Sequence, residues 1–140
     1  NTKFTDFDVQ TSATTIVDYS GNHFVRSPKK SAVLGFDYDL PLNAAGKIVV
    51  GADFKYQSKQ YYFTTNQDNP RLAQNGYTLA NARVSYKTAD EALIYTVYAN
   101  NLGDRKYLNH ALPGTQGSQG DVSIWGEPRT FGVSVAANWK

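Results

Sequence analysis

Residue types that could support catalysis are present in this chain, but they form no recognisable catalytic signature. The two histidines, His23 and His110, fall in polar stretches, and no serine or carboxylate spacing defines a catalytic triad or a metal site. Gly114, Gly117 and Gly120 lie among Gln and Ser residues, a composition typical of a flexible loop. The absence of cysteine excludes a thiolate metal site and a disulfide framework. The sequence therefore predicts no enzyme activity, no bound metal and no cofactor.

Binding is better supported, because aromatic and basic side chains gather in two polar stretches. Aromatic faces and an arginine fork could together grip a flat, anionic molecule. The residues are Tyr61, Tyr62, Phe63 and Arg71 in the first stretch, and Tyr107, His110 and Trp125 around the second. For His23 and His110 the alternative is an ordinary surface histidine. The net charge of +2 is small and its basic residues are scattered, which argues against a nucleic-acid partner.

The segments between the polar stretches alternate with a period of two. In residues 131–139 the odd positions read Phe, Val, Val, Ala and Trp, and the even positions read Gly, Ser, Ala and Asn. This pattern predicts a strand with one apolar face and one small or polar face. Phe131 and Trp139 would stand roughly 20 Å apart along the normal of a tilted barrel, close to the apolar band of about 25 Å in outer-membrane barrels. An edge strand of a soluble sandwich alternates in the same way.

The alternation predicts about six strands in all. They are residues 1–7 (the end of a strand), 31–40, 47–58, 77–87, 93–102 and 131–139. In residues 93–102 the pattern is blurred, and the better apolar face is Leu93, Tyr95, Val97 and Ala99, opposed by Ile94 and Tyr98. The connections are long at 8–30, short at 41–46, long at 59–76, short at 88–91 and long at 109–123. Outer-membrane barrels sort their connections in this way, into long outer loops and short periplasmic turns.

Two motifs before the last strand carry a family resemblance. Residues 101–107 read Asn-Leu-Gly-Asp-Arg-Lys-Tyr, and residues 126–131 read Gly-Glu-Pro-Arg-Thr-Phe. In this order they resemble the end of the TonB-dependent outer-membrane receptors, where the first motif closes the penultimate strand and the second opens the last. Gly103 departs from the bulky residue usual in the family, and Lys140 follows the usual terminal aromatic. The motif residues are Asn101, Leu102, Asp104, Tyr107, Gly126, Pro128, Arg129, Phe131 and Trp139.

The resemblance implies an all-β, transmembrane antiparallel β-barrel of 22 strands closed by an N-terminal plug. Residues 1–140 would supply its last strands as a single, incomplete domain. An open sheet of this size would leave unpaired edges in lipid, so we expect the chain to be the C-terminal part of a longer protein or one segment of a split protein.

By the same resemblance, the whole protein is a receptor in the outer membrane of a Gram-negative bacterium. It would import a scarce nutrient such as an iron–siderophore complex, powered by TonB through an N-terminal box that this chain lacks. Its partners would be membrane lipid, the plug and remaining strands, TonB, and a small-molecule substrate such as a ferric chelate. Outer loops would hold the ligand, so the binding candidates are Tyr61, Tyr62, Phe63, Arg71, His110 and Trp125.

Structural roles compete with binding at several positions. Arg129 would make an ion pair or rim contact with Glu127 or Asp104, and Asn101 and Asp104 would cap the exit of the strand through hydrogen bonds to backbone. Rim anchoring is the alternative for Tyr56, Tyr107 and Phe131. Two other functions stay open, a small self-standing outer-membrane barrel of structural or adhesive role and a soluble β-sandwich or lipocalin-like binding module.

Overall fold

The computed structural model describes residues 2–66, 71–114 and 120–139, which form β-strands joined by turns and irregular segments. Within those ranges, no helix has the length and apolar character needed to cross a membrane. The chain divides into two compact units. We call them the loop unit, which comprises Asn1–Ser31, Gln57–Tyr77 and Tyr107–Gly126, and the sheet unit, which comprises Ala32–Tyr56, Thr78–Lys106 and Glu127–Lys140.

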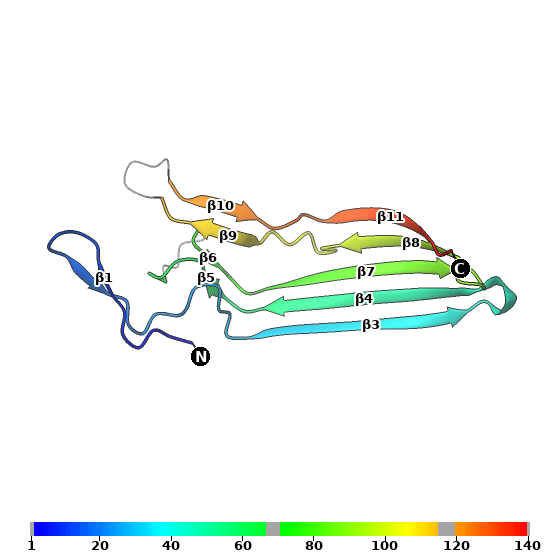
Figure 1. Ribbon diagram of the computed structural model, residues 1–140, viewed down its shortest axis with the longest axis horizontal. Helices are drawn as coiled ribbons and strands as arrows, with labels where there is room; N and C mark the ends of the chain where they lie inside the picture. Colours follow the sequence, from blue (N-terminus) through cyan, green and yellow to red (C-terminus); the bar gives the residue numbers. More distant parts are fainter. Residues whose placement is uncertain (1, 67–70, 115–119, 140) are drawn as a thin grey trace. The chain divides into compact units, whose positions relative to one another are not determined.

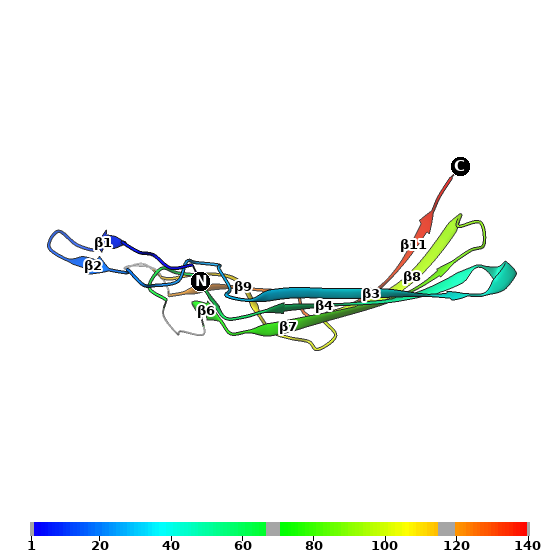
Figure 2. The ribbon, with the colours of Figure 1, turned by 90° about the horizontal axis from the view of Figure 1, so that it is seen from below.

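The sheet unit is built on five antiparallel strands in the order β11-β8-β7-β4-β3 (Figure 1). Their bounds are β3 Ser31–Pro41, β4 Lys47–Gln57, β7 Tyr77–Lys87, β8 Leu93–Asn100 and β11 Thr130–Ala137. The turn from β3 to β4 contains a short 3-10 helix, η1 (Asn43–Ala45). Figure 2 shows β8 and β11 turning out of the plane of β3, β4 and β7, as the twist of a sheet requires. Five of the expected strands are therefore confirmed, with ends shifted by up to two residues.

The register assigns the two faces of the sheet. Val97 on β8 lies opposite Val133 on β11 and opposite Val84 on β7, so one row of valines crosses three strands. Side chains alternate along each strand, so Leu93, Tyr95 and Ala99 share the face of Val97. The expected assignment in the blurred segment is confirmed, and Ile94 and Tyr98 point to the polar face.

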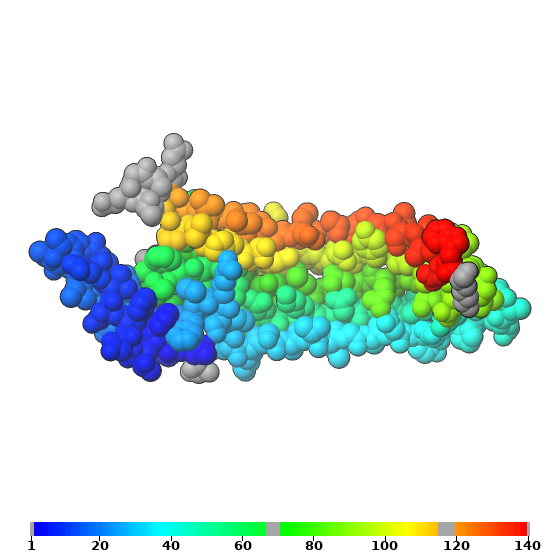
Figure 3. Space-filling view, in the orientation of Figure 1, coloured from blue at the N-terminus to red at the C-terminus, as the bar shows by residue number. Residues whose placement is uncertain are grey.

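The apolar face of the sheet unit is uncovered. Phe36, Val97 and Val133 expose 57%, 60% and 77% of their surface. Figure 3 shows β11 (red) and β3 (cyan) as the two borders of the sheet unit. In a soluble β-sandwich a second sheet would bury this face. Among the described residues of the sheet unit there is no such second sheet, and the apolar face stays uncovered.

In its described residues, the loop unit contains three short antiparallel strand pairs and a small core. Its strand pairs are β1 (Asp8–Gln10) with β2 (Ile16–Asp18), β5 (Gln60–Tyr61) with β6 (Ala73–Gln74), and β9 (Leu108–Leu112) with β10 (Val122–Trp125). Tyr62, Leu72, Leu108 and Ala111 form the buried apolar cluster. The three stretches expected to be plain loops thus carry paired strands.

The expectation of a strand end in residues 1–7 is wrong. Residues 2–7 contain only an isolated bridge between Lys3 and His23. The ring of Phe4 stacks on Phe7 and contacts Phe24, with both ring centroids 4.5 Å away. These contacts between aromatic rings fold the N-terminal segment back on itself, so it does not extend the sheet.

The connectivity follows the predicted alternation. In the antiparallel sheet, the starts of β3, β7 and β11 and the ends of β4 and β8 all lie at one end (Figure 1). The segments 57–77 and 107–126 connect strand ends at that end, and residues 1–31 lead into β3 there. Both short turns join strand ends at the other end. Long and short connections are therefore sorted to opposite ends of the sheet.

Candidate functional site

The polar face of the sheet unit carries a network of charged side chains. Arg83 Nη2 on β7 lies 2.5 and 2.6 Å from the two carboxylate oxygens of Asp37 on β3, reaching across β4 at Gly51. Asn81 donates to Asp53 at 2.7 Å. The side chains of Arg83 and Asp37 are about half exposed. This face is therefore polar and charged, in contrast with the row of valines on the other face.

A second ion-pair group lies near the short turns. Lys47 Nζ is 3.2 Å from Asp39 Oδ2 and 3.4 Å from Glu91 Oε1. Tyr86 donates to the carbonyl of Ala45 at 2.6 Å, which ties β7 to the turn at η1. These contacts fix the turn end of the sheet unit.

Asn101 anchors the exit of β8, as expected. Its side chain accepts from the Arg105 amide at 2.8 Å and donates to the carbonyls of Arg105 and Glu127 at 3.0 Å each. Asn101 is only 5% exposed and has a φ of 49°, a left-handed conformation that Asn tolerates better than most residues. Nothing lies within 4 Å of a Cβ added at Gly103, so the chain has room there for the bulky residue usual in the family.

Arg129 is held by backbone contacts more than by its charge. Its amide donates to Asp104 Oδ1 at 3.1 Å, and its guanidinium donates to the carbonyl of Leu102 at 3.4 Å. The guanidinium carbon also lies 5.8 Å from the ring centroid of Phe131. The expected contact with Asp104 is confirmed, but it runs through the main chain and not through an ion pair.

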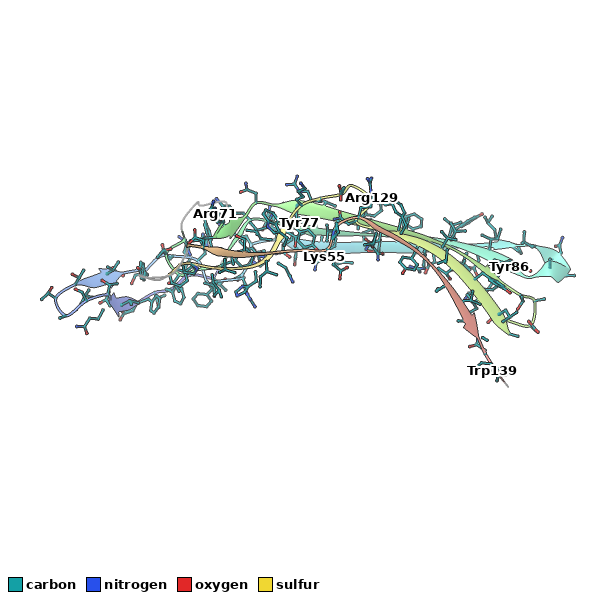
Figure 4. All side chains as sticks on the ribbon, turned by 90° about the horizontal axis from the view of Figure 1, so that it is seen from above. Lys55, Arg71, Tyr77, Tyr86, Arg129 and Trp139 are labelled. Atoms are coloured by element: carbon teal, nitrogen blue, oxygen red, sulfur yellow. The ribbon has the colours of Figure 1, made fainter. Side chains whose placement is uncertain are left out.

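The remaining motif residues divide between packing and exposure. The Tyr107 ring stacks on Tyr77 with centroids 4.8 Å apart, and it covers Gly126 so closely that any side chain there would clash. The Gly126 amide also donates to the Tyr107 carbonyl at 2.8 Å. Pro128 and Trp139 are exposed, and Figure 4 shows Trp139 beyond the end of β11. The glycine of the second motif is therefore required by the tyrosine of the first.

All six ligand-binding candidates lie in the loop unit. Tyr62 is buried at 5% exposure, and its hydroxyl donates to the Leu108 carbonyl and accepts from Gln60. Burial raises the pKa of the Tyr62 phenol, partly offset by its hydrogen bond with Gln60. Tyr61 is half-buried and stacks on His23 with an interplanar angle of 6°. These two neighbours in sequence thus occupy different environments.

The structure brings Tyr62 and His110 together and adds Arg26. The Tyr62 and His110 rings meet edge to face with centroids 6.0 Å apart. His110 Nδ1 lies 2.6 Å from Arg26 Nη2, a contact between residues far apart in sequence. Sequence reasoning missed Arg26, since nothing in its local pattern marks a partner on another hairpin.

The other candidates are on the surface. Phe63 and Trp125 expose 38% and 59% of their surface. Arg71 is exposed, and Ser123 donates to its carbonyl at 3.4 Å. A ligand-binding role for the six residues stays a prediction. Within the described ranges, no group of three His, Cys, Asp or Glu residues could hold a metal ion.

Comparisons with known proteins agree on the family. The family model described as "TonB dependent receptor-like, beta-barrel" matches residues 1–102. The ferric-pyoverdine M114 receptor PbuA of Pseudomonas sp. (strain M114) is 30% identical over 105 residues, which cover 74% of this chain and 12% of that receptor. The match to the family model includes Asn101 and Leu102 but ends before Asp104.

Two solved structures resemble the chain. The ferric yersiniabactin uptake receptor FyuA from Yersinia pestis is 20% identical with a TM-score of 0.72, over 84% of this chain and 17% of that one, which shows a shared fold. BauA, the ferric preacinetobactin receptor from Acinetobacter baumannii, is 28% identical with a TM-score of 0.62, over 84% of this chain and 16% of that one.

The chain spans a small part of the length of these relatives, between 12% and 17%. The matching proteins are receptors and not enzymes. Their fold agrees with the all-β sheet unit, which forms an open, unclosed sheet within the described residues. The chain belongs to the TonB-dependent receptor β-barrel family.

Proposed function

We propose that this chain forms part of the wall and outer loops of an outer-membrane receptor that binds and imports a ferric siderophore. The observation that carries the proposal is the two-faced sheet of a family member, with an uncovered apolar face and a charged opposite face. PbuA is named as a ferric-pyoverdine receptor and BauA as a ferric preacinetobactin receptor. They support iron–siderophore import over the import of other nutrients.

The apolar face of the sheet unit would contact lipid. Val84, Val97 and Val133 form a continuous row across three strands, and their exposure in water would be costly, at about 25 cal/mol for each Å². The opposite face, with Arg83 paired to Asp37, would line the hydrated lumen. The barrel wall of an outer-membrane protein requires this division.

The edges of the sheet call for further strands. Within the described residues, the outer edges of β3 and β11 have no strand partner in the sheet. An unpaired backbone group in lipid costs several kcal/mol, so remaining strands of the same protein would pair with both edges. Five strands are fewer than the about eight of the smallest barrels, which disfavours a self-standing barrel.

The loop unit would take part in holding the ligand outside the membrane. Phe63 and Trp125 offer exposed aromatic faces, and Arg71 is an exposed basic residue. These groups suit a flat, anionic ferric chelate. The core around Tyr62 and the contact between Arg26 and His110 would hold these side chains in position. The substrate passes through without chemical change in this proposal, so no catalytic residue is assigned.

Transport would also need parts outside this chain, namely the plug and the TonB contact. A direct test is uptake of radioactive iron by iron-starved cells that lack the receptor carrying this chain. Uptake of one ferric siderophore should be lost, restored by the intact gene, and absent again when TonB is removed. Undiminished uptake of every siderophore that the organism uses would overturn the proposal.

A further inference from the structure

One row of side chains crosses the polar face of the sheet unit from β3 to β11. Tyr98 on β8 lies directly opposite Arg83 on β7 and Gly132 on β11. Arg83 reaches over Gly51 on β4 to its ion pair with Asp37 on β3. The row therefore contains one residue from each of the five strands, in the order in which the strands lie in the sheet.

The two halves of this row are built alike, because in each half a long side chain lies over a glycine of the neighbouring strand. A Cβ added at Gly51 would collide with the guanidinium of Arg83, and one added at Gly132 would collide with the ring and hydroxyl of Tyr98. Neighbouring strands lie about 4.8 Å apart, so each side chain spans one strand spacing. Arg83 points toward the β3 border of the sheet, and Tyr98 points toward the β11 border.

The two halves differ in the contact made beyond the glycine. Arg83 meets the carboxylate of Asp37, which itself extends over Gly51 from β3. Within the described residues, the hydroxyl of Tyr98 has no hydrogen-bond partner, and β11 has no strand on its outer side (Figure 1). A phenylalanine ring would cover Gly132 equally well, so covering this glycine does not account for the hydroxyl.

Other polar side chains on this face are paired between strands. The hydroxyls of Ser85 on β7 and Thr96 on β8 lie 2.8 Å apart, and Asn81 on β7 donates to Asp53 on β4 at 2.7 Å. Tyr98 exposes 37% of its surface, so this chain does not enclose it. The hydroxyl of Tyr98 is therefore open to a partner from a strand beyond β11.

We infer that Tyr98 donates a hydrogen bond to a carboxylate on the strand that pairs with the outer edge of β11. The inference rests on the proposed function, in which further strands of the receptor complete the wall. An aspartate has the right reach, because Asp37 already extends over the glycine of the strand next to its own. The tyrosine hydroxyl can donate, and a hydrogen bond to an ionised acceptor is about twice as strong as one between neutral groups.

This contact fixes the register of the strand pairing at the β11 border. A slip of one residue would move the carboxylate to the opposite face of the sheet, away from Tyr98. Tyr98 is therefore a positioning residue for the pairing of β11 with its neighbour, and Gly132 leaves the space through which the two side chains meet.

The first experiment maps the neighbour of Tyr98 in the intact receptor in outer-membrane vesicles. The photoreactive amino acid p-benzoylphenylalanine replaces Tyr98, and mass spectrometry identifies the residue that is cross-linked on irradiation. The same probe in place of Ser134, on the polar face of β11, reports whether a strand lies at this border. We expect the probe at Tyr98 to label a strand outside residues 1–140, at or directly beside an aspartate or glutamate.

The second experiment measures the coupling between the two side chains. Amide hydrogen exchange of residues 131–136 is compared in the unaltered receptor, in Tyr98→Phe, in a variant with alanine in place of the cross-linked acidic residue, and in the double variant. Each single change should speed exchange about ten-fold, and the double variant should exchange no faster than the single ones. Tyr95→Phe removes a hydroxyl from the opposite face of β8 and should change exchange less than two-fold.

Several results would overturn the inference. These are labelling confined to β11, a labelled strand without an acidic residue at the site, and exchange effects that add in the double variant. Labelling of a further strand from Ser134 but not from Tyr98 would show that the strand is present and that the tyrosine contact is wrong. Iron uptake is not measured, so each of these results leaves the proposed import of a ferric siderophore untouched.

Discussion

The two units of this chain place their apolar side chains in opposite ways. The loop unit buries Tyr62, Leu72 and Leu108 to 5% exposure or less. The sheet unit leaves Phe131 and Val133 more than 70% exposed, and its buried side chains include the polar Ser85 and Asn101. One chain therefore contains a small, ordinary core and a sheet with an uncovered apolar face.

The difference fits the surroundings proposed for each unit. A unit that faces water gains stability by burying apolar area, whereas a sheet that faces lipid, as proposed here, would gain nothing from a buried core and would keep its polar contacts on the other face. The ion pair of Arg83 with Asp37 lies on the face opposite the valine row, as expected for such a sheet. Substitutions on the two faces of the sheet unit and in the core of the loop unit should therefore have different effects on stability.

The largest effect is expected on the apolar face of β11. Val133→Arg should lower the free energy of unfolding in lipid vesicles by about 2–4 kcal/mol, because it places a charge against hydrocarbon near the middle of the strand. Urea titration in vesicles measures it. Ser134→Arg, one residue along on the polar face, is the control and should cost far less. Equal costs would remove the distinction between the faces.

Asn101→Ala should have the next largest effect and lower the free energy of unfolding by about 2–3 kcal/mol. It leaves the carbonyls of Arg105 and Glu127 without their donor and forces a left-handed φ on alanine. Asn109→Ala, at an exposed asparagine of β9, is the matched control. Chemical unfolding measures both variants. A cost for Asn101→Ala no greater than that of the control would show that the anchor at the exit of β8 is dispensable.

Tyr62→Phe should lower the free energy of unfolding of the loop unit by about 1–2 kcal/mol, because the buried carbonyl of Leu108 loses its hydrogen-bond donor. Amide hydrogen exchange in β9 measures this loss, with Tyr38→Phe, an exposed tyrosine of the sheet unit, as the control.

The same residue gives a pH dependence. Because burial raises the pKa of Tyr62, the folded unit holds this proton more tightly than the unfolded chain does. Its contribution is fully present below the unfolded value of about 10 and is lost as pH rises through the folded pKa. Protection of the loop unit should therefore fall above about pH 10 in the unaltered protein, and this component should vanish in Tyr62→Phe.

The smallest effect concerns the polar face at Gly51. A Cβ there would collide with the Asp37 carboxylate and the Arg83 guanidinium, whereas a Cβ at Gly35 makes only ordinary contacts at 3.7 Å. Gly51→Ala should therefore be less stable than Gly35→Ala by about 0.2–1 kcal/mol, the worth of a half-exposed ion pair. This difference in stability between the two variants should disappear when Arg83→Gln is also present. If the difference persists, the ion pair is not its cause.

The period-two pattern was sufficient to predict the five strands of the sheet, because each strand has one apolar face and one polar face. The roles of Asn101 and Asp104 were predictable as well, because their side chains accept hydrogen bonds from backbone amides. The amide bonded to Asn101 is four residues along the chain, and the one bonded to Asp104 lies across one loop. The burial of Tyr62 could not be predicted, because the Leu108 carbonyl that accepts its hydrogen bond belongs to another hairpin. The contact between Arg26 and His110 arises in the same way, from folding of the loop segments together.

The central claim is that one face of the sheet touches hydrocarbon, and cysteine scanning of β11 tests it most directly. The chain contains no cysteine of its own, so single cysteines at residues 131–136 can each carry a fluorescent label. In vesicles of acyl-chain-brominated lipid, labels at Phe131, Val133 and Val135 should be quenched, and labels at the even positions should be quenched by aqueous iodide instead. Equal quenching by iodide at odd and even positions, with none by brominated lipid, would contradict the account.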